Sequence, residues 1–181
     1  LDEKGVVICD ANVTLLIKNP SDAVANLSTN AGNIIVSNEC AAKGKTDVQD
    51  YSTNYTVNGA GNYSMNASAV IGSLNPEMSS NFEVANNVEF DVARASQTRI
   101  LPTAKYNMNF TLKANKNYIG TMVEVVEPGF AITPQDNLGI EILENYTLLT
   151  FNVSFVNGST YNIGYEYDAP DISPELYLLG P

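Results

Sequence analysis

The sequence contains no histidine and no tryptophan, and only two of its 181 residues are cysteines. Without histidine there is no imidazole base, no conventional nucleophile triad and no zinc–histidine site. Without tryptophan, the Cys–Trp–Cys core signature of a true immunoglobulin domain is excluded. Glycine-rich nucleotide loops, the G-x-S-x-G motif and acidic calcium loops are also missing. We therefore expect a protein that is not an enzyme and that uses no metal or cofactor.

Carboxylates are the remaining candidates for catalysis, because a glycosidase needs only two of them. Four glutamates lie close together in the sequence, namely Glu124, Glu127, Glu141 and Glu144. Glutamate is an ordinary outward-facing residue on exposed strands, so we interpret all four as solvated. Lys18 and Lys105 are interpreted in the same way, although lysines in β-sandwiches can form isopeptide bonds.

Basic residues are scarce: nine Lys and Arg against 20 Asp and Glu give a formal net charge of −11. Nucleic acids and anionic membranes are bound through clusters of Lys and Arg, so we expect neither as a partner. Charged residues make up only 16% of the chain, against about 25% in typical proteins. Polarity comes instead from 23 Asn, 13 Ser and 13 Thr. Because these side chains do not titrate, we expect the surface to stay hydrated in an acidic medium.

Long apolar runs are also missing, so we expect no membrane-spanning segment in the mature chain. The apolar fraction of 44% is ordinary for a globular protein, and the length fits one domain. The first residue is leucine rather than methionine, which suggests that a leader has been removed. These features predict a folded, secreted chain.

Nine asparagines stand in the N-glycosylation sequon, Asn-X-Ser/Thr with X not proline. They are Asn12, Asn26, Asn54, Asn62, Asn66, Asn109, Asn145, Asn152 and Asn157. With 26 Ser and Thr among 181 residues, 23 asparagines would give about three sequons by chance. The excess predicts passage across a glycosylating membrane and covalent N-glycans. Asn62, Asn66, Asn109 and Asn152 alternate with apolar residues, so we expect their side chains to point away from the core.

Apolar and polar side chains alternate along the whole chain, and no segment shows helical spacing. The alternating runs cover residues 7–17, 34–36, 63–71, 82–92, 106–112, 119–125, 138–142, 149–155 and 161–167. Turn residues separate them, and Asn157-Gly158 between two runs predicts a hairpin. About nine strands without helices predict an all-β fold, a single antiparallel β-sandwich. Residues 41–61 are interpreted as a surface excursion, and no linker indicates an internal division.

Cys9 and Cys40 form an even pair in a chain with the features of a secreted protein, which predicts a disulfide. Such a bridge would stabilise the fold by about 3–4 kcal/mol on the chain-entropy model. The C-terminal segment contains apolar residues that must pack on something, namely Leu176, Tyr177, Leu178 and Leu179. Its prolines exclude a central strand, so we expect an extended clamp that packs on its own sandwich or on a neighbouring subunit.

Together these features resemble the type-I-pilin-like subunits of surface filaments, in particular the glycosylated archaeal thread filaments. The resemblance rests on the near-terminal strand 7–17, the early cysteine pair, the dense sequons and the all-β pattern. It implies an incomplete Ig-like or pilin-like sandwich, residues 19–181, that is completed by a donor strand within residues 1–18 of another subunit. Because head-to-tail contacts do not close, it also implies a homopolymeric extracellular filament that serves adhesion.

The donor-strand candidates are Leu1, Val6, Val7, Ile8, Ala11, Val13, Leu15 and Ile17. Two arrangements are open. Either residues 1–8 are a short donor and Cys9 bonds Cys40 of the same chain, or the donor runs through 7–17 and Cys9 bonds Cys40 of the neighbour. The alternative function is a monomeric glycosylated surface module, either carbohydrate-binding or associated with a surface layer.

Overall fold

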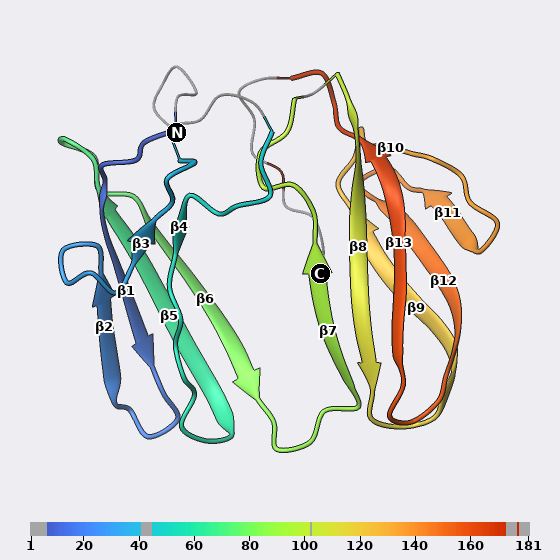
Figure 1. Ribbon diagram of the computed structural model, residues 1–181, viewed down its shortest axis with the longest axis horizontal. Coiled ribbons are helices and arrows are strands. Elements are labelled where there is room, and N and C mark those ends of the chain that lie inside the picture. Colours follow the sequence, from blue (N-terminus) through green and yellow to red (C-terminus); the bar gives the residue numbers. More distant parts are fainter. Residues whose placement is uncertain (1–6, 41–44, 102, 173–176, 178–181) are drawn as a thin grey trace. The chain divides into compact units, whose positions relative to one another are not determined.

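The computed structural model describes residues 7–40, 45–101, 103–172 and 177. Within these ranges the chain forms thirteen β-strands and no helix, and the paired strands are antiparallel (Figure 1). This confirms the predicted all-β fold class. The chain divides into two compact units: unit 1 comprises Leu1–Lys43 and Val48–Asn87, and unit 2 comprises Gly44–Asp47 and Val88–Pro181.

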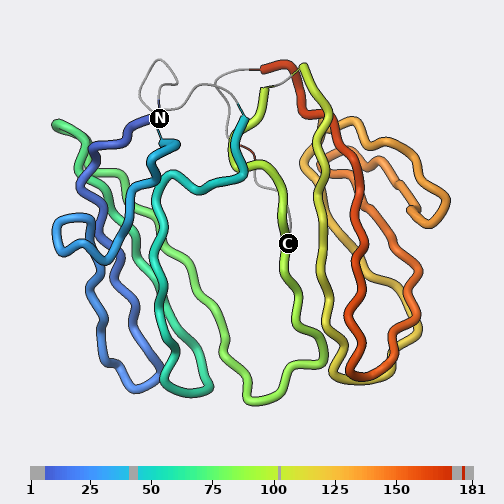
Figure 2. Tube along the Cα trace, in the orientation of Figure 1, coloured from blue at the N-terminus to red at the C-terminus, as the bar shows by residue number. Residues whose placement is uncertain are grey.

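The main sheet of unit 1 has four strands in the order β2-β1-β5-β6. Their bounds are Asn12–Lys18 for β1, Val24–Ser28 for β2, Gly61–Val70 for β5 and Glu77–Val84 for β6. A small second sheet pairs β3 (Ile35–Val36) with β4 (Tyr51–Ser52). Figure 2 traces the chain from β1 into β2, and later through β5 along the other side of β1. The N-terminal strand is therefore central in its own sheet.

Aromatic side chains cover the inner face of this sheet. Ile17 and Tyr63 point to that face and are buried. The rings of Phe82 and Tyr63 stack with centroids 4.9 Å apart, and Tyr55 meets Tyr63 edge-on at 6.3 Å. Tyr63 Oη also donates a hydrogen bond to Gly59 O at 2.9 Å. The segment before β5 is thereby tied to the inner face of the sheet.

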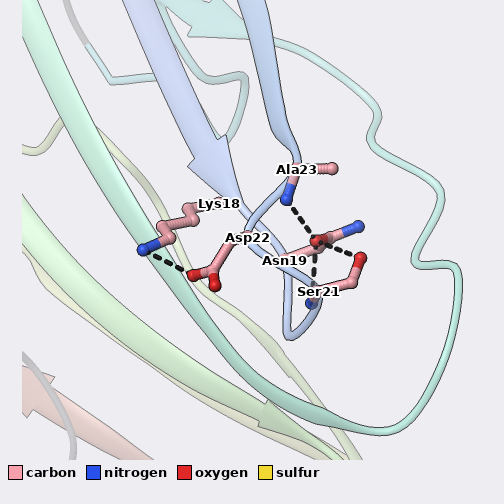
Figure 3. Close-up of polar contacts among 5 residues, drawn as sticks. All are labelled: Lys18, Asn19, Ser21, Asp22 and Ala23. Carbon is pink, nitrogen blue, oxygen red and sulfur yellow. Dashed lines mark hydrogen bonds and ion pairs between the residues drawn. The ribbon is translucent and has the colours of Figure 1, made fainter.

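The turn between β1 and β2 sets the register of this hairpin. Asn19 Oδ1 accepts hydrogen bonds from Ser21 N–H, Ser21 Oγ and Ala23 N–H at 2.9–3.0 Å (Figure 3). Asp22 adopts a left-handed φ of 65°, which aspartate tolerates, and its carboxylate lies 2.7 Å from Lys18 Nζ. Because a one-residue slip would move every β2 side chain to the other face, this turn decides which residues lie across from β1.

Unit 2 contains two sheets, one in the order β10-β13-β8-β7 and one in the order β11-β12-β9. The first is built from β7 (Phe90–Ala95), β8 (Lys105–Ala114), β10 (Ala131–Ile132) and β13 (Thr160–Asp168). The second is built from β9 (Tyr118–Val126), β11 (Leu138–Ile142) and β12 (Thr147–Phe155).

The two sheets of unit 2 pack face to face around one apolar core. Every second residue of β8 is buried, as its alternating sequence predicts. Aromatic rings connect the layers: Phe110 lies 6.2 Å from Phe151, and Phe90 lies 5.9 Å from Phe155, between ring centroids. Unit 2 therefore has the two-layer arrangement of a β-sandwich.

The Asn157-Gly158 turn is not the hairpin that its sequence predicted. The strand β12 pairs with β11 and β9, whereas β13 pairs with β10 and β8, so this turn carries the chain between the two sheets. Ser159 N–H donates to Val156 O at 3.1 Å, and Gly158 has a φ of 82° while Asn157 has no positive φ. One positive φ at the third position is typical of a type II turn, whereas a two-residue hairpin favours the primed turns.

The run 82–92, expected as one alternating segment, is interrupted at the boundary between the units. The strand β6 ends at Val84 and β7 begins at Phe90. The intervening residues contain no glycine or proline, so composition does not indicate the division. Within the expected excursion 41–61, residues 45–47 join unit 2, where Thr46 forms an isolated bridge with Arg99.

Candidate functional site

The sequon asparagines are distributed over both units, and eight of the nine are exposed. Unit 1 contains Asn12, Asn26, Asn54, Asn62 and Asn66, and unit 2 contains Asn109, Asn145, Asn152 and Asn157. The exception is Asn12, which is half-buried and whose Oδ1 accepts a hydrogen bond from Thr29 Oγ1 at 3.3 Å. A glycan could be attached at each of the exposed positions without displacing a core side chain.

Four of these asparagines share the outer face of the main sheet of unit 1. They are Asn12, Asn26, Asn62 and Asn66. In the register of the sheet, Leu16 of β1 lies opposite Asn26 of β2 on one side and opposite Asn66 of β5 on the other. The other two lie four residues before Leu16 on β1 and before Asn66 on β5, so they point to the same side. We call this surface the sequon face.

In unit 2, Asn109 lies on the outer face of the four-stranded sheet, opposite Gly164 of β13 and Ala95 of β7. A Cβ atom at Gly164 would lie 2.3 Å from Met108 O and 3.3 Å from Asn109 Oδ1. Only glycine fits at this position. The sequon therefore has the smallest possible neighbour on one side and a methyl group on the other.

The Cys9–Cys40 disulfide forms within the chain, with Cα atoms 5.8 Å apart, which confirms the predicted bridge. Of the two arrangements left open by the sequence, this is the intramolecular one. Tyr51 of β4 reinforces it: the Tyr51 hydroxyl donates to Ile8 O at 2.8 Å and accepts from Ala11 N–H at 3.1 Å. The residues on both sides of Cys9 are thereby fixed to the second sheet of unit 1.

Three of the eight donor-strand candidates lie in β1 of the chain's own sheet, and a fourth directly precedes it. The inner side of β1 and the residue before it supply Ala11, Val13, Leu15 and Ile17, which are buried or half-buried. Because β1 pairs with both β2 and β5, it would have to break two ladders before it could complete another subunit. Val7 and Ile8 precede β1 and are half-buried. Leu1 and Val6 lie outside the described residues.

Of the C-terminal candidates, Tyr177 is the one that the structure describes. It is half-buried, and its ring meets that of Phe130 edge-on with centroids 5.0 Å apart. Tyr177 therefore packs on the core of its own unit. Leu176, Leu178 and Leu179 lie outside the described residues.

Unit 2 contains a buried charge that the sequence pattern did not reveal. Glu124 of β9, expected to face solvent, is 2% exposed and forms an ion pair with Arg94 of β7. Tyr165 Oη lies 3.4 Å from the same carboxylate oxygen, and the Arg94 guanidinium lies 5.3 Å from the centroid of the Phe110 ring. Burial raises the pKa of the Glu124 carboxyl, while the Arg94 charge acts to lower it. The pair joins the two layers of the sandwich.

The orientation of β9 explains why this residue was missed. Its odd-numbered positions resemble a core-facing set, yet three of them are exposed, namely Ile119, Val123 and Val125. Pairing with β12 decides the orientation, because it places Glu124 opposite the buried Leu149. Since β9 carries apolar residues on both faces, alternation within the strand could not assign the core side.

The remaining charged candidates are on the surface. Glu141 and Glu144 are exposed, and Glu127 is half-buried. Lys105 Nζ lies 3.1 Å from Glu166 Oε1, which is an ordinary surface ion pair. In the part of the chain that the structure describes, no three acidic or cysteine side chains gather as metal ligands would. The same part has no helix of the length and apolarity that a membrane crossing requires.

Comparison of the chain with protein-family models, with curated proteins and with solved structures finds no match. The function is therefore inferred from the residues and their arrangement.

Proposed function

We propose that this chain is a non-catalytic structural module of the cell exterior, which carries N-glycans and assembles with copies of itself. The placement of the sequons carries the proposal: eight of nine are exposed, and four share one sheet face. Sugars at these positions would coat the surface and leave the core intact. The intrachain disulfide supports an oxidising, extracellular location.

The edge of β9 supports self-association. It is an end strand of its sheet, and its outward side chains include Ile119, Val123 and Val125, which are 86, 48 and 37% exposed. An end strand of nine residues with exposed β-branched side chains is a template for a strand of another chain. Repeated head-to-tail contacts of this kind build a filament that could serve adhesion. In the assembly proposed here, β1 stays in its own sheet. Any donor strand that the chain supplies to a neighbouring subunit is then limited to the residues before Cys9.

The full chain, secreted from a glycosylating host, tests the proposal. Intact mass before and after enzymatic removal of N-glycans measures sequon occupancy, and negative-stain electron microscopy measures assembly. Glycosylated chains in thin, uniform filaments support the proposal. Glycosylated single particles would overturn self-association and leave the monomeric surface module. A secreted chain without glycans would overturn the proposal as a whole.

A matched pair of variants tests the role of β9. Val123 and Val88 are both 48% exposed, but only Val123 lies on β9. Because lysine on an edge strand opposes pairing with another chain, Val123→Lys should abolish filaments and Val88→Lys should leave them intact. Equal assembly of the two variants would show that β9 is not the interface.

A further inference from the structure

We propose that the N-glycan on Asn66 packs against the protein: its first sugar occupies a hollow on the sequon face and covers Leu16 and Val24. This inference rests on the proposed glycosylation and adds a structural role for one particular glycan. Three observations carry it, namely an apolar pair on a polar face, a hollow at that pair and a sequon asparagine in the lining of the hollow.

Leu16 breaks the alternation of β1. Leu15 and Ile17 lie on the inner side of the strand, so Leu16 points to the sequon face, where it is 40% exposed. Val24 of β2 lies diagonally across on the same face and is 59% exposed. These two neighbouring apolar side chains on a largely polar sheet face leave apolar area in water, and covering that area is favourable.

Leu16 and Val24 line a hollow of about 290 Å³ on this face. Its lining also includes the polar residues Lys18, Ser64 and Asn81. A pyranose sugar has the matching chemistry, because C–H groups cover one ring face while hydroxyl groups point outward from the ring edge. An N-acetyl group adds a methyl that can contact leucine or valine. The volume lies just below the range of small-ligand sites, which suits the first sugar of a glycan rather than an extended ligand.

Asn66 lines this hollow and lies opposite Leu16 in the register of β1 and β5. Its Nδ2 lies 3.4 Å from Ser79 Oγ. In glycosyl transfer this nitrogen loses one proton and bonds to the anomeric carbon of a lipid-pyrophosphate-linked sugar, whose pyrophosphate carrier leaves. The second N–H group remains and can keep the contact with Ser79. Asn26 also lies opposite Leu16 but is not among the lining residues, so the assignment is to Asn66.

A double-mutant cycle between the glycan and Leu16 tests the proposal. The full chain is secreted from a eukaryotic host, and its N-glycans are trimmed by an endoglycosidase to one N-acetylglucosamine. Ser68→Ala removes the sequon but keeps Asn66, and Leu16→Ser removes the apolar side chain. Peptide mass spectrometry measures occupancy of Asn66. Amide hydrogen exchange of residues 12–18 measures the stability of the sheet.

Loss of the sugar should speed this exchange by about three- to sevenfold in the Leu16 background, because the exposed 40% of that side chain returns to water. With Leu16→Ser present, Ser68→Ala should speed the exchange less, because only Val24 is then left for the sugar to cover. The same Ser68→Ala change in a host that does not glycosylate should be neutral. That comparison separates loss of the sugar from loss of the Ser68 hydroxyl.

Asn109 supplies the matched control, since its cross-strand neighbours are Gly164 and Ala95 and offer little apolar area to cover. Asn109→Gln should leave the exchange of residues 105–114 unchanged. A sugar on Asn66 without coupling to Leu16 would overturn this inference and leave the proposed function intact. An Asn66 without a glycan, in a chain whose other sequons are glycosylated, would also overturn this inference and leave the proposed function intact. Only a secreted chain with no glycan at any of the nine sequons would overturn both this inference and the proposed function.

Discussion

Replacing Arg94 with methionine tests how the two layers of unit 2 are held together. The substitution removes the guanidinium and leaves the Glu124 carboxylate, which is 2% exposed, inside the sandwich. Removing one partner of a buried ion pair costs about 3–5 kcal/mol. The Arg94 side chain is 29% exposed, so some water reaches the pair. We therefore expect a loss of stability near the lower end, about 3 kcal/mol at neutral pH.

Glu124→Gln is the matched control for this variant. Glutamine keeps the length of the side chain, its amide oxygen can accept from Arg94, and no buried negative charge remains. Burial raises the Glu124 pKa despite Arg94, so the carboxylate is less favourable in the folded chain than in the unfolded one. Glu124→Gln should therefore change stability by less than about 1 kcal/mol.

The contribution of Glu124 to stability changes with pH in a defined direction. A group whose pKa is raised by folding contributes stability below its unfolded value, 4.5 for this carboxyl, and loses that contribution as pH rises through the folded pKa. In Arg94→Met the attraction that lowers the Glu124 pKa is gone, so this pKa rises further. The stability that Arg94→Met loses relative to the unmutated chain should therefore become smaller as the pH falls from 7 toward about 5. Glu124→Gln lacks the titrating carboxyl, so its stability relative to the unmutated chain should not improve over this pH range.

Urea unfolding followed by circular dichroism at pH 7 and at about pH 5 measures both effects. Equal losses for Arg94→Met and Glu124→Gln at pH 7 would refute the reasoning. A deficit of Arg94→Met that stays constant between the two pH values would refute it as well.

Three further predictions concern the N-terminal bridge and Gly164 of β13. Cys9→Ser opens the bridge, whose cysteines are 31 residues apart, and should cost about 3–4 kcal/mol in urea unfolding; a covalent ladder of the unmutated chain on non-reducing gels would contradict an intrachain bridge. Tyr51→Phe removes the hydroxyl that holds the residues beside Cys9 and should cost about 1–2 kcal/mol, seen as faster amide exchange there; unchanged exchange would count against this role. Gly164→Ala places a methyl carbon 2.3 Å from Met108 O and should cost more than about 1 kcal/mol, and an unchanged urea midpoint would be the contrary result.

The sequence alone determined the features that depend only on residues close together along the chain. Alternation in β8 predicted its buried and exposed sides, because successive side chains of a strand point to opposite faces. The same reasoning predicted that Asn66, Asn109 and Asn152 face outward. With only two cysteines in the chain, one intrachain pairing was possible. The fold class followed from the same local pattern, repeated without helical spacing.

Tertiary structure decided everything that depends on pairing between distant segments. Pairing with β12 turned Glu124 inward, and the ladders of β1 with β2 and β5 placed Leu16 between Asn26 and Asn66. The Asn157-Gly158 turn changed sheets instead of closing a hairpin. In each case the deciding contact is a hydrogen-bonded register, and a shift of one residue reverses every side chain of a strand. Composition and alternation within one segment do not contain that register, because it is fixed by the partner strand.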